Sequence, residues 1–354
     1  MKHRAGVERN AGSPEGLGLK SGRMFAEGIL VMGRATFTGL IALALALVVA
    51  APASARRAGP AIGIGEQQSS MFASRWFNQL ELHDARYLAP WDVMQDRYQL
   101  ALLDNWMAAA QRSHARVTLG FGHSLRNPYF AHRLPSWREF QQQFRLIRKH
   151  YPWVRNYISW NEANNPRGMT AHRPGRVAQY FDVIARNCRG CNVVAADLLD
   201  WRNMIPWARA FRRAAHVRPR IWGLHNYGDA NHFHTKSTQA LLRFTKGQIW
   251  FTETGGVVLR RQPLGPKHRM HTWWYGKRHA ARSVAHVFQL ACMSRRITRV
   301  YLYNWQTPRK VTTWDSGIVD SHGRRRPAYF VIQRWLSRSA QASRHGGRRA
   351  LCGR

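Results

Sequence analysis

The feature that most constrains the fold of this chain is a regular alternation of short apolar runs with longer amphipathic stretches. The short runs are rich in β-branched and aromatic residues, as strands are, and there are eight of them, at residues 61–65, 85–88, 116–121, 154–160, 192–196, 220–225, 248–252 and 300–305. Between them, apolar residues recur at helical spacing, as in Phe140, Phe144 and Ile147. Strands that alternate with helices in this way predict a parallel sheet.

The number of strand–helix units distinguishes the two common parallel-sheet architectures. Eight units in roughly 280 residues fit an α/β fold of the (β/α)8 TIM barrel type, whose usual length is about 250 residues. An open doubly wound sheet is the alternative, but no G-x-G-x-x-G follows any strand, and Gly63-Ile64-Gly65 is followed by Glu66 and Gln67. We therefore expect residues 56–337 to form a single-domain barrel.

An apolar run of thirteen residues, from Gly39 to Ala51, precedes the predicted barrel. It is shorter than the roughly 20 residues that span a bilayer, and Ala53-Ser54-Ala55 supplies the small residues of a cleavage site. Residues 1–55 are therefore expected to act as a secretory signal peptide, with a retained membrane anchor as the alternative. The polar stretch ahead of the run indicates that translation can begin at Met24 or Met32 instead of Met1.

The chain carries 55 Lys and Arg against 18 Asp and Glu, a formal net charge of +37. Such a charge attracts polyanions, but it indicates association and not a particular activity. The basic residues form no known nucleic-acid-binding motif, so we expect no specific nucleic-acid partner. Residues 338–354 are expected to be a flexible basic tail that associates with anionic cell-wall polymers. We expect the protein to be monomeric.

Four cysteines, Cys188, Cys191, Cys292 and Cys352, allow three disulfide pairings, and an exported chain meets conditions in which disulfides form. Cys188 and Cys191 form a C-x-x-C. No second C-x-x-C or paired His follows at zinc spacing, which favours a local disulfide or two buried thiols over metal binding or redox chemistry. No metal site and no cofactor is implied.

Only five glutamates follow residue 55, and their positions are informative: Glu66, Glu81, Glu139, Glu162 and Glu253. Glu139 belongs to a Ser-x-x-Glu sequence that predicts a helix-capping box, so its role is structural. Glu66, Glu162 and Glu253 follow the first, fourth and seventh predicted strands, and active sites of such barrels lie at that end of the strands. We expect Glu66 to be structural or to lie at the rim of the substrate site.

Glu162 and Glu253 are the candidate catalytic pair. Retaining glycoside hydrolysis needs two carboxyl groups roughly 5 to 5.5 Å apart, one to attack the anomeric carbon and one to protonate the leaving oxygen. In a closed barrel the ends of the fourth and seventh strands open into the same mouth. The sequence therefore predicts a glycosidase, and a barrel that binds glycan or cell wall without cleaving it is the alternative.

Short motifs at these strand ends resemble a clan of (β/α)8 retaining glycoside hydrolases whose acid/base and nucleophile are glutamates at the ends of strands four and seven. The matching segments are Trp160-Asn161-Glu162, Phe251-Thr252-Glu253, His225-Asn226-Tyr227 after the sixth strand, and Trp305 after the eighth. The resemblance extends in element order over the region after residue 55, but it does not identify a family within the clan. It implies that Glu162 is the acid/base, kept protonated by desolvation and by the charge of the nucleophile Glu253.

The same resemblance implies the substrate-binding residues. Asn161 would contact the 2-hydroxyl of the sugar at the cleavage point, and Trp305 would form the floor beneath that sugar. Tyr227 would hydrogen-bond the nucleophile, and Arg86 would place a fixed positive charge beside it. His225 either faces the substrate or satisfies a loop carbonyl.

Aromatic residues near the predicted site suit a carbohydrate, because indole rings stack on the apolar face of a pyranose. We expect the loop 271–275, which contains Trp273 and Trp274, to be a stacking platform, and Trp314 to border the site without reacting. Which polysaccharide or glycoside is cleaved, and whether internally or from an end, is not predicted.

Overall fold

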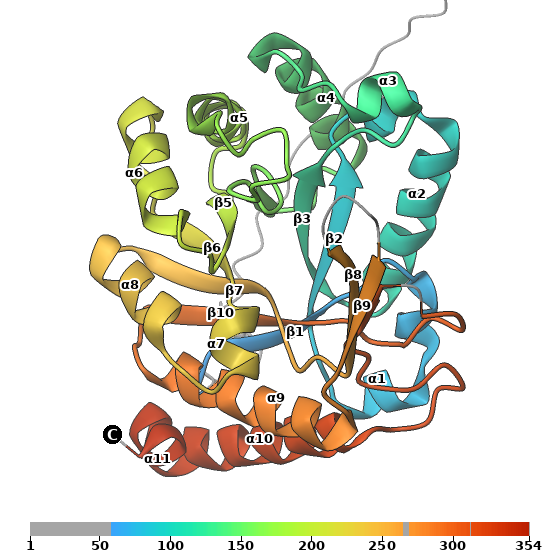
Figure 1. The fold of residues 1–354 in the computed structure, drawn as a ribbon, viewed down its shortest axis with the longest axis vertical. Coiled ribbons are helices and arrows are strands. Elements are labelled where there is room, and N and C mark those ends of the chain that lie inside the picture. Colours follow the sequence, from blue (N-terminus) through green and yellow to red (C-terminus); the bar gives the residue numbers. More distant parts are fainter. Residues whose placement is uncertain (1–57, 265–268, 312, 354) are drawn as a thin grey trace, which may run out of the picture. The chain divides into compact units, whose positions relative to one another are not determined.

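The computed structural model describes residues 58–264, 269–311 and 313–353, which belong to one compact unit. Eight parallel strands close into a barrel in the order β1-β10-β7-β6-β5-β4-β3-β2 (Figure 1). The prediction of a single-domain (β/α)8 barrel is confirmed, and each strand overlaps a predicted run: β1 (Ala61–Gly65), β2 (Asp84–Pro90), β3 (Arg116–Gly122), β4 (Asn156–Ile158), β5 (Asn192–Leu199), β6 (Ile221–His225), β7 (Gln248–Thr254) and β10 (Ile297–Tyr303).

Helices alternate with the barrel strands and lie around the outside of the barrel (Figure 1). In α4 (Trp137–His150), the predicted stripe of Phe140, Phe144 and Ile147 is buried, and Ser136 and Glu139 form the predicted capping box. The other long helices are α2 (Arg97–Arg112), α5 (Pro174–Asn187), α6 (Met204–Ala214), α8 (Lys236–Phe244), α9 (Lys277–Cys292) and α10 (Pro327–His345). Shorter helices are α1 (Arg75–Gln79), α3 (Pro128–Ala131), α7 (Tyr227–Asn231) and α11 (Gly347–Cys352).

The interior of the barrel is filled by side chains from its own strands. A buried cluster distinct from the larger core takes its members only from five barrel strands: Ile158, Val194, Ile221, Trp250 and Tyr301. The barrel interior is therefore a packed core and not a pore. Polar side chains at the carboxyl ends of the strands lie on this rigid apolar core.

A second, three-stranded antiparallel sheet has the order β11-β8-β9. The connection after β7 forms the hairpin of β8 (Leu259–Leu264) and β9 (Arg269–Trp274), and the connection after β10 supplies β11 (Trp314–Asp315). The segment 271–275, expected to be a loop, is therefore mostly strand β9, because residues 271–274 pair with β8.

The prediction of a flexible tail beginning at Arg338 is wrong, because this residue lies inside α10. The apolar face of the helix continues past it through the buried Ala342, and Leu351 of α11 is also buried. A disulfide between Cys292 and Cys352 joins α11 to the end of α9, and the local disulfide Cys188–Cys191 is also formed. Residues 338–353 are thus part of the folded unit.

The predicted signal peptide, residues 1–55, and its alternative as a membrane anchor lie outside the described residues. Among the helices that the structure does describe, none combines the length and the apolar character that a bilayer crossing requires.

Candidate active site

A cavity of about 610 Å³ opens at the carboxyl ends of the barrel strands. Its lining includes both predicted catalytic residues and three of the predicted substrate-binding residues: Glu162, Glu253, Arg86, Asn161 and Tyr227. A second hollow of about 750 Å³ lies against α9, α10 and α11, and no carboxylate is among its lining residues. Of these two cavities, the first therefore combines space for a ligand with paired acids.

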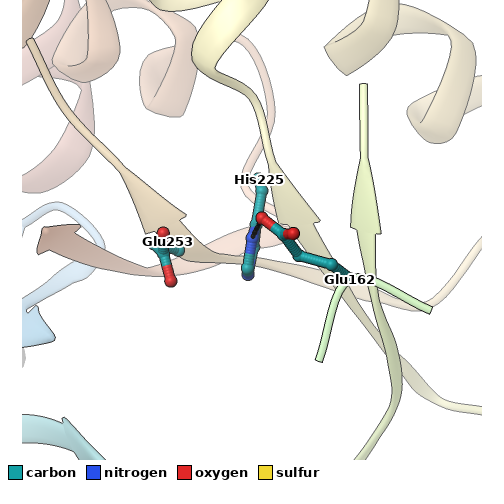
Figure 2. A group of neighbouring side chains, drawn as sticks. All are labelled: Glu162, His225 and Glu253. Carbon is teal, nitrogen blue, oxygen red and sulfur yellow. Dashed lines mark hydrogen bonds and ion pairs between the residues drawn. The ribbon is translucent and has the colours of Figure 1, made fainter. Parts of the chain in front are cut away.

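Glu162 and Glu253 face each other across the buried imidazole of His225 (Figure 2). One carboxylate oxygen of each glutamate and one ring nitrogen of His225 all lie within 4.8 Å of one another. The nearest oxygens of the two carboxylates are thus no more than 4.8 Å apart, which suits the roughly 5 to 5.5 Å between the carboxyl groups of retaining glycosidases better than the roughly 6.5 to 9.5 Å of inverting ones.

Glu162 is positioned by a short irregular segment after β4. Its backbone has φ 43°, in the left-handed region, which costs a non-glycine residue about 1–3 kcal/mol and persists only where neighbours fix it. The flanking amides provide this restraint, since Asn161 N donates to the Phe121 carbonyl of β3 (2.7 Å) and Ala163 N to the Asp197 carbonyl of β5 (2.9 Å). The side chain is 31% exposed at the cavity surface.

Glu253, near the end of β7, has a donor on each carboxylate oxygen. Arg86 Nη1 donates to Oε2 (3.0 Å), and Tyr227 Oη donates to Oε1 (3.1 Å). The hydrogen bond predicted from Tyr227 and the positive charge predicted from Arg86 are thus both present. With its side chain 15% exposed, Glu253 is held in one orientation and still reaches the cavity.

Arg86 links three acidic or polar groups of the site. It is 2% exposed, and its Nη2 donates to Asn161 Oδ1 (2.7 Å) and to Asp197 Oδ2 (2.8 Å). Burial lowers the pKa of Arg86, but the charges of Asp197 and Glu253 more than offset this and raise it above its ordinary value. The guanidinium therefore remains charged and fixes Asn161 beside the two glutamates.

Asp197 was missed in the sequence, although it is fully buried at the centre of this network. Burial raises the pKa of Asp197, but the positive charges of Arg86 and His225 lower it by more than burial raises it. The carboxyl group is therefore ionised. An acid directly after the predicted strand 192–196 was the available signal. The strand actually continues to Leu199, which places Asp197 inside it.

His225 is fully buried and does not line the cavity, so neither of its expected roles fits. Its Nδ1 lies 3.4 Å from Glu162 Oε1, and its Nε2 lies 3.2 Å from Asp197 Oδ2. Burial lowers the pKa of His225, but Glu253 and Asp197 raise it to about 10. At neutral pH this imidazole therefore carries a positive charge between the acids.

The expected protonation of Glu162 in the free site is corrected by this charge. Burial raises the pKa of Glu162, but His225, and then Asn165 and Arg86, lower it below the ordinary value. The carboxyl group of Glu162 is thus ionised before substrate binds, and the nearest proton that can be transferred to it is on the His225 imidazole.

Trp305 does not form the floor of the cavity. It is 1% exposed and packs edge-on against Phe77 and Tyr329, in the core. The strand ends at Tyr303, two residues earlier than predicted, and Tyr303 lines the cavity instead. Glu66 accepts the backbone amide of Trp305 (3.1 Å), in agreement with its expected structural role.

The spacing of Glu162, His225 and Glu253 would also allow a cation to be bound. The donor set argues against it. Glu253 already accepts hydrogen bonds from Arg86 and Tyr227, and the raised pKa of His225 keeps its imidazole protonated, whereas an imidazole must be neutral to bind a metal ion. The positive charge that these acids require is already supplied by the protein.

No protein-family model and no curated protein sequence matches the chain. Solved structures do match in fold. A GH5_18 from Streptomyces cattleya in complex with GlcNAc has a TM-score of 0.54 at 14% identity, covering 82% of this chain and 82% of that one. A monomeric β-xylosidase from Caulobacter crescentus has a TM-score of 0.54 at 14% identity, covering 80% and 69%. Fungal β-1,4-galactanases have a TM-score of 0.55 at 12% identity, covering 77% and 98%.

At these identities the similarity is one of fold. The barrel matches structures of (β/α)8 glycoside hydrolases from several families, as the resemblance in sequence predicted, and the family within the clan remains unresolved.

Proposed function

We propose that this protein is an exported retaining glycoside hydrolase that cleaves O-glycosidic bonds of a polysaccharide or oligosaccharide by double displacement. The observation that carries the proposal is the approach of the Glu162 and Glu253 carboxylates to within 4.8 Å beside an open cavity. The apolar run and cleavage pattern before residue 56 support export.

In the first step, a carboxylate oxygen of Glu253 attacks the anomeric carbon while the bond to the leaving oxygen breaks. Glu162 gives a proton to that oxygen, and a covalent glycosyl-enzyme forms. In the second step, Glu162 removes a proton from water, whose oxygen attacks the anomeric carbon and releases Glu253. Arg86 and Tyr227 hold Glu253 in place throughout by their two hydrogen bonds.

The proton for the first step is available from His225. Its Nδ1 lies 3.4 Å from Glu162 Oε1, so the proton can pass between them without solvent. A bound sugar excludes water from the cavity, and a neutral imidazole and carboxylic acid are less costly to desolvate than an ion pair. Substrate binding therefore favours the protonated form of Glu162 that the reaction needs.

A barrel that binds glycan without cleaving it is the second candidate. One observation favours it, namely the lowered pKa of Glu162, which leaves the acid without its proton in the empty site. The two functions differ in whether any substrate is turned over.

The test is a screen of glycan and aryl-glycoside panels with the wild type, with Glu253→Gln, and with Glu81→Gln as a matched control, because Glu81 is exposed. Glu253→Gln is expected to lower kcat by on the order of 10⁴-fold or more, and Glu81→Gln to leave it unchanged. Proton NMR of the first product should show the anomer of the substrate. The opposite anomer would refute double displacement, and glycan binding without turnover would favour the second candidate.

A further inference from the structure

The three-stranded sheet outside the barrel contributes side chains to the same cavity. On β8, Arg260 is paired directly with Trp273 of β9 and with Trp314 of β11. Residues directly opposite each other in an antiparallel sheet project from the same face. Arg260 and Trp314 both line the cavity, so this face of the sheet forms one of its walls.

This wall contacts the tyrosine that hydrogen-bonds the nucleophile. The ring of Trp314 meets the ring of Tyr227 edge-on at 4.9 Å, and Tyr227 donates its hydroxyl hydrogen to Glu253. The indole Nε1 of Trp314 donates to Ser316 Oγ (2.8 Å), which fixes the ring plane. Sugar units on the nucleophile's side of the scissile bond would therefore pass over Trp314.

Arg260 carries a charge that the protein does not neutralise. Its guanidinium donates to the neutral amide oxygen of Gln262 (2.7 Å) and lies 5.9 Å from the Trp273 ring centre, and it forms no ion pair within the described part of the chain. Arg86, the other arginine of the cavity, has two carboxylate partners. A half-buried guanidinium beside aromatic rings is suited to a planar anion, which it binds through two parallel hydrogen bonds.

A second part of the cavity wall, directly after β5, has different chemistry. It contains Asp200 and the exposed Trp201, and Asp200 accepts the backbone amide of Asp229 (3.0 Å). An acidic sugar there would face a carboxyl group. Neutral sugars suit this wall, and a negatively charged sugar suits the wall of Arg260.

We propose that Arg260, flanked by Trp273 and Trp314, binds the carboxylate of an acidic sugar on the nucleophile's side of the scissile bond, so that the substrate is a carboxylate-bearing glycan. The inference rests on the proposed glycosidase site and names its substrate class. The carboxylate pairs with the guanidinium, and the apolar face of the pyranose packs on the Trp314 indole.

The test uses affinity gel electrophoresis, which needs no turnover. Glu253→Gln serves as the non-hydrolysing parent, and Arg260→Gln, Arg260→Lys and Arg278→Gln are added to it separately. Arg278 is exposed in the first turn of α9, so its variant makes the same change of net charge away from the cavity. Gels contain carboxylated polysaccharides, their carboxyl-reduced counterparts or sulfated ones, at about 0.3 M salt to screen non-specific attraction to the basic surface.

Arg260→Gln is expected to weaken binding to at least one carboxylated polymer by roughly 10- to 100-fold. Its binding to the carboxyl-reduced counterpart of that polymer should not change. Arg260→Lys should recover part of the loss, because it restores the charge but not the two parallel hydrogen bonds. Arg278→Gln should match the parent. Equal losses for both polymers would assign Arg260 to support of the aromatic wall, and a loss confined to sulfated polymers, or no retardation by any carboxylated polymer, would also overturn the proposal.

Kinetics separate this inference from the proposed function. If the wild type hydrolyses only neutral glycans, and Arg260→Gln does so at an unchanged rate, the acidic substrate class fails while the glycosidase stands. If no glycan is hydrolysed but the carboxylate-dependent binding is lost in Arg260→Gln, the glycosidase fails and the subsite stands.

Discussion

Replacing Arg86 by methionine is expected to destabilise the fold and to slow the proposed reaction. The buried guanidinium donates to Glu253, Asn161 and Asp197, and methionine fills similar space without donors or charge. Removing one partner of a buried ion pair costs about 3–5 kcal/mol, because the other charge stays buried and unpaired. His225 still faces Asp197, so we expect a loss of about 3 kcal/mol in the free energy of unfolding at pH 7.5.

The loss should depend on pH, with a sign that follows from Asp197. In the wild type, Arg86 and His225 hold the pKa of Asp197 below its ordinary value, although burial raises it. Without Arg86, less positive charge counteracts the effect of burial, so the pKa of Asp197 in the folded state rises. A group whose folded pKa exceeds its unfolded pKa costs stability at higher pH and costs less as the pH falls. The destabilisation should therefore be smaller at pH 5 than at pH 7.5.

Urea unfolding followed by tryptophan fluorescence at both pH values measures this difference. The matched control is Arg116→Met at the opposite end of the barrel, where Arg116 is 52% exposed and its partner Asp84 keeps a second partner in Arg299. This control should lose only about 0–1 kcal/mol. A loss below about 1 kcal/mol for Arg86→Met, or the same loss at both pH values, would refute the interpretation of this network as an electrostatic unit.

Four further predictions follow from the structure. Tyr227→Phe should lower kcat by roughly 10- to 100-fold with little change in Tm, because it removes one hydrogen bond to Glu253; an unchanged kcat would contradict the assigned contact. Because the pKa of His225 in the folded state is about 10, the stability that its charge contributes is fully present below about pH 6.5 and is lost as the pH rises toward 10. The loss should reach up to about 1.4 kcal/mol per pH unit. In urea unfolding at a series of pH values, His225→Asn should not show this pH dependence. Replacing Cys292 and Cys352 by serine, which opens a loop with a sequence separation of 60, should cost up to about 4 kcal/mol in urea unfolding, and a cost near zero would contradict the pairing. Dialysis against a chelator should leave activity on the preferred glycoside unchanged, and activity restored by an added divalent ion would contradict the charge balance assigned to the site.

The barrel could be predicted because its determinants are local. Parallel strands covered on both faces are short apolar runs, and amphipathic helices show a single stripe, so both are visible in a single window of sequence. The β8–β9 hairpin was not predicted, since its segment contains Arg260, Arg261 and Gln262 and depends on pairing with β11 about 50 residues later. The end of α10 was misjudged because its polar and basic residues conceal a thin apolar face that is recognised only once α9 packs against it.

In the candidate site, the positions of the main residues could be predicted from the sequence, but the burial and electrostatic environment of these residues could not. Glu162, Glu253 and Tyr227 lie at or just after the carboxyl ends of strands, and barrel closure alone brings such residues together. Trp305 was misplaced because a shift of two residues at the end of β10 exchanges a residue of the core for one at the rim. The burial of Asp197 depends on the register between β5 and β6, which no local pattern reveals.

The protonation state of Glu162 was misjudged because it depends on all the charged groups of the site together. Retention requires one acid with a proton and one without, and the two glutamates alone would reach that state by mutual repulsion. Here His225 and Arg86 supply two positive charges against the three acids, and the proton resides on His225. Transfer from His225 to Glu162 creates the reactive form with no change in the net charge of the site. Glu162 and His225 consequently titrate as a pair, and the alkaline limit of activity belongs to that pair and not to the carboxyl group.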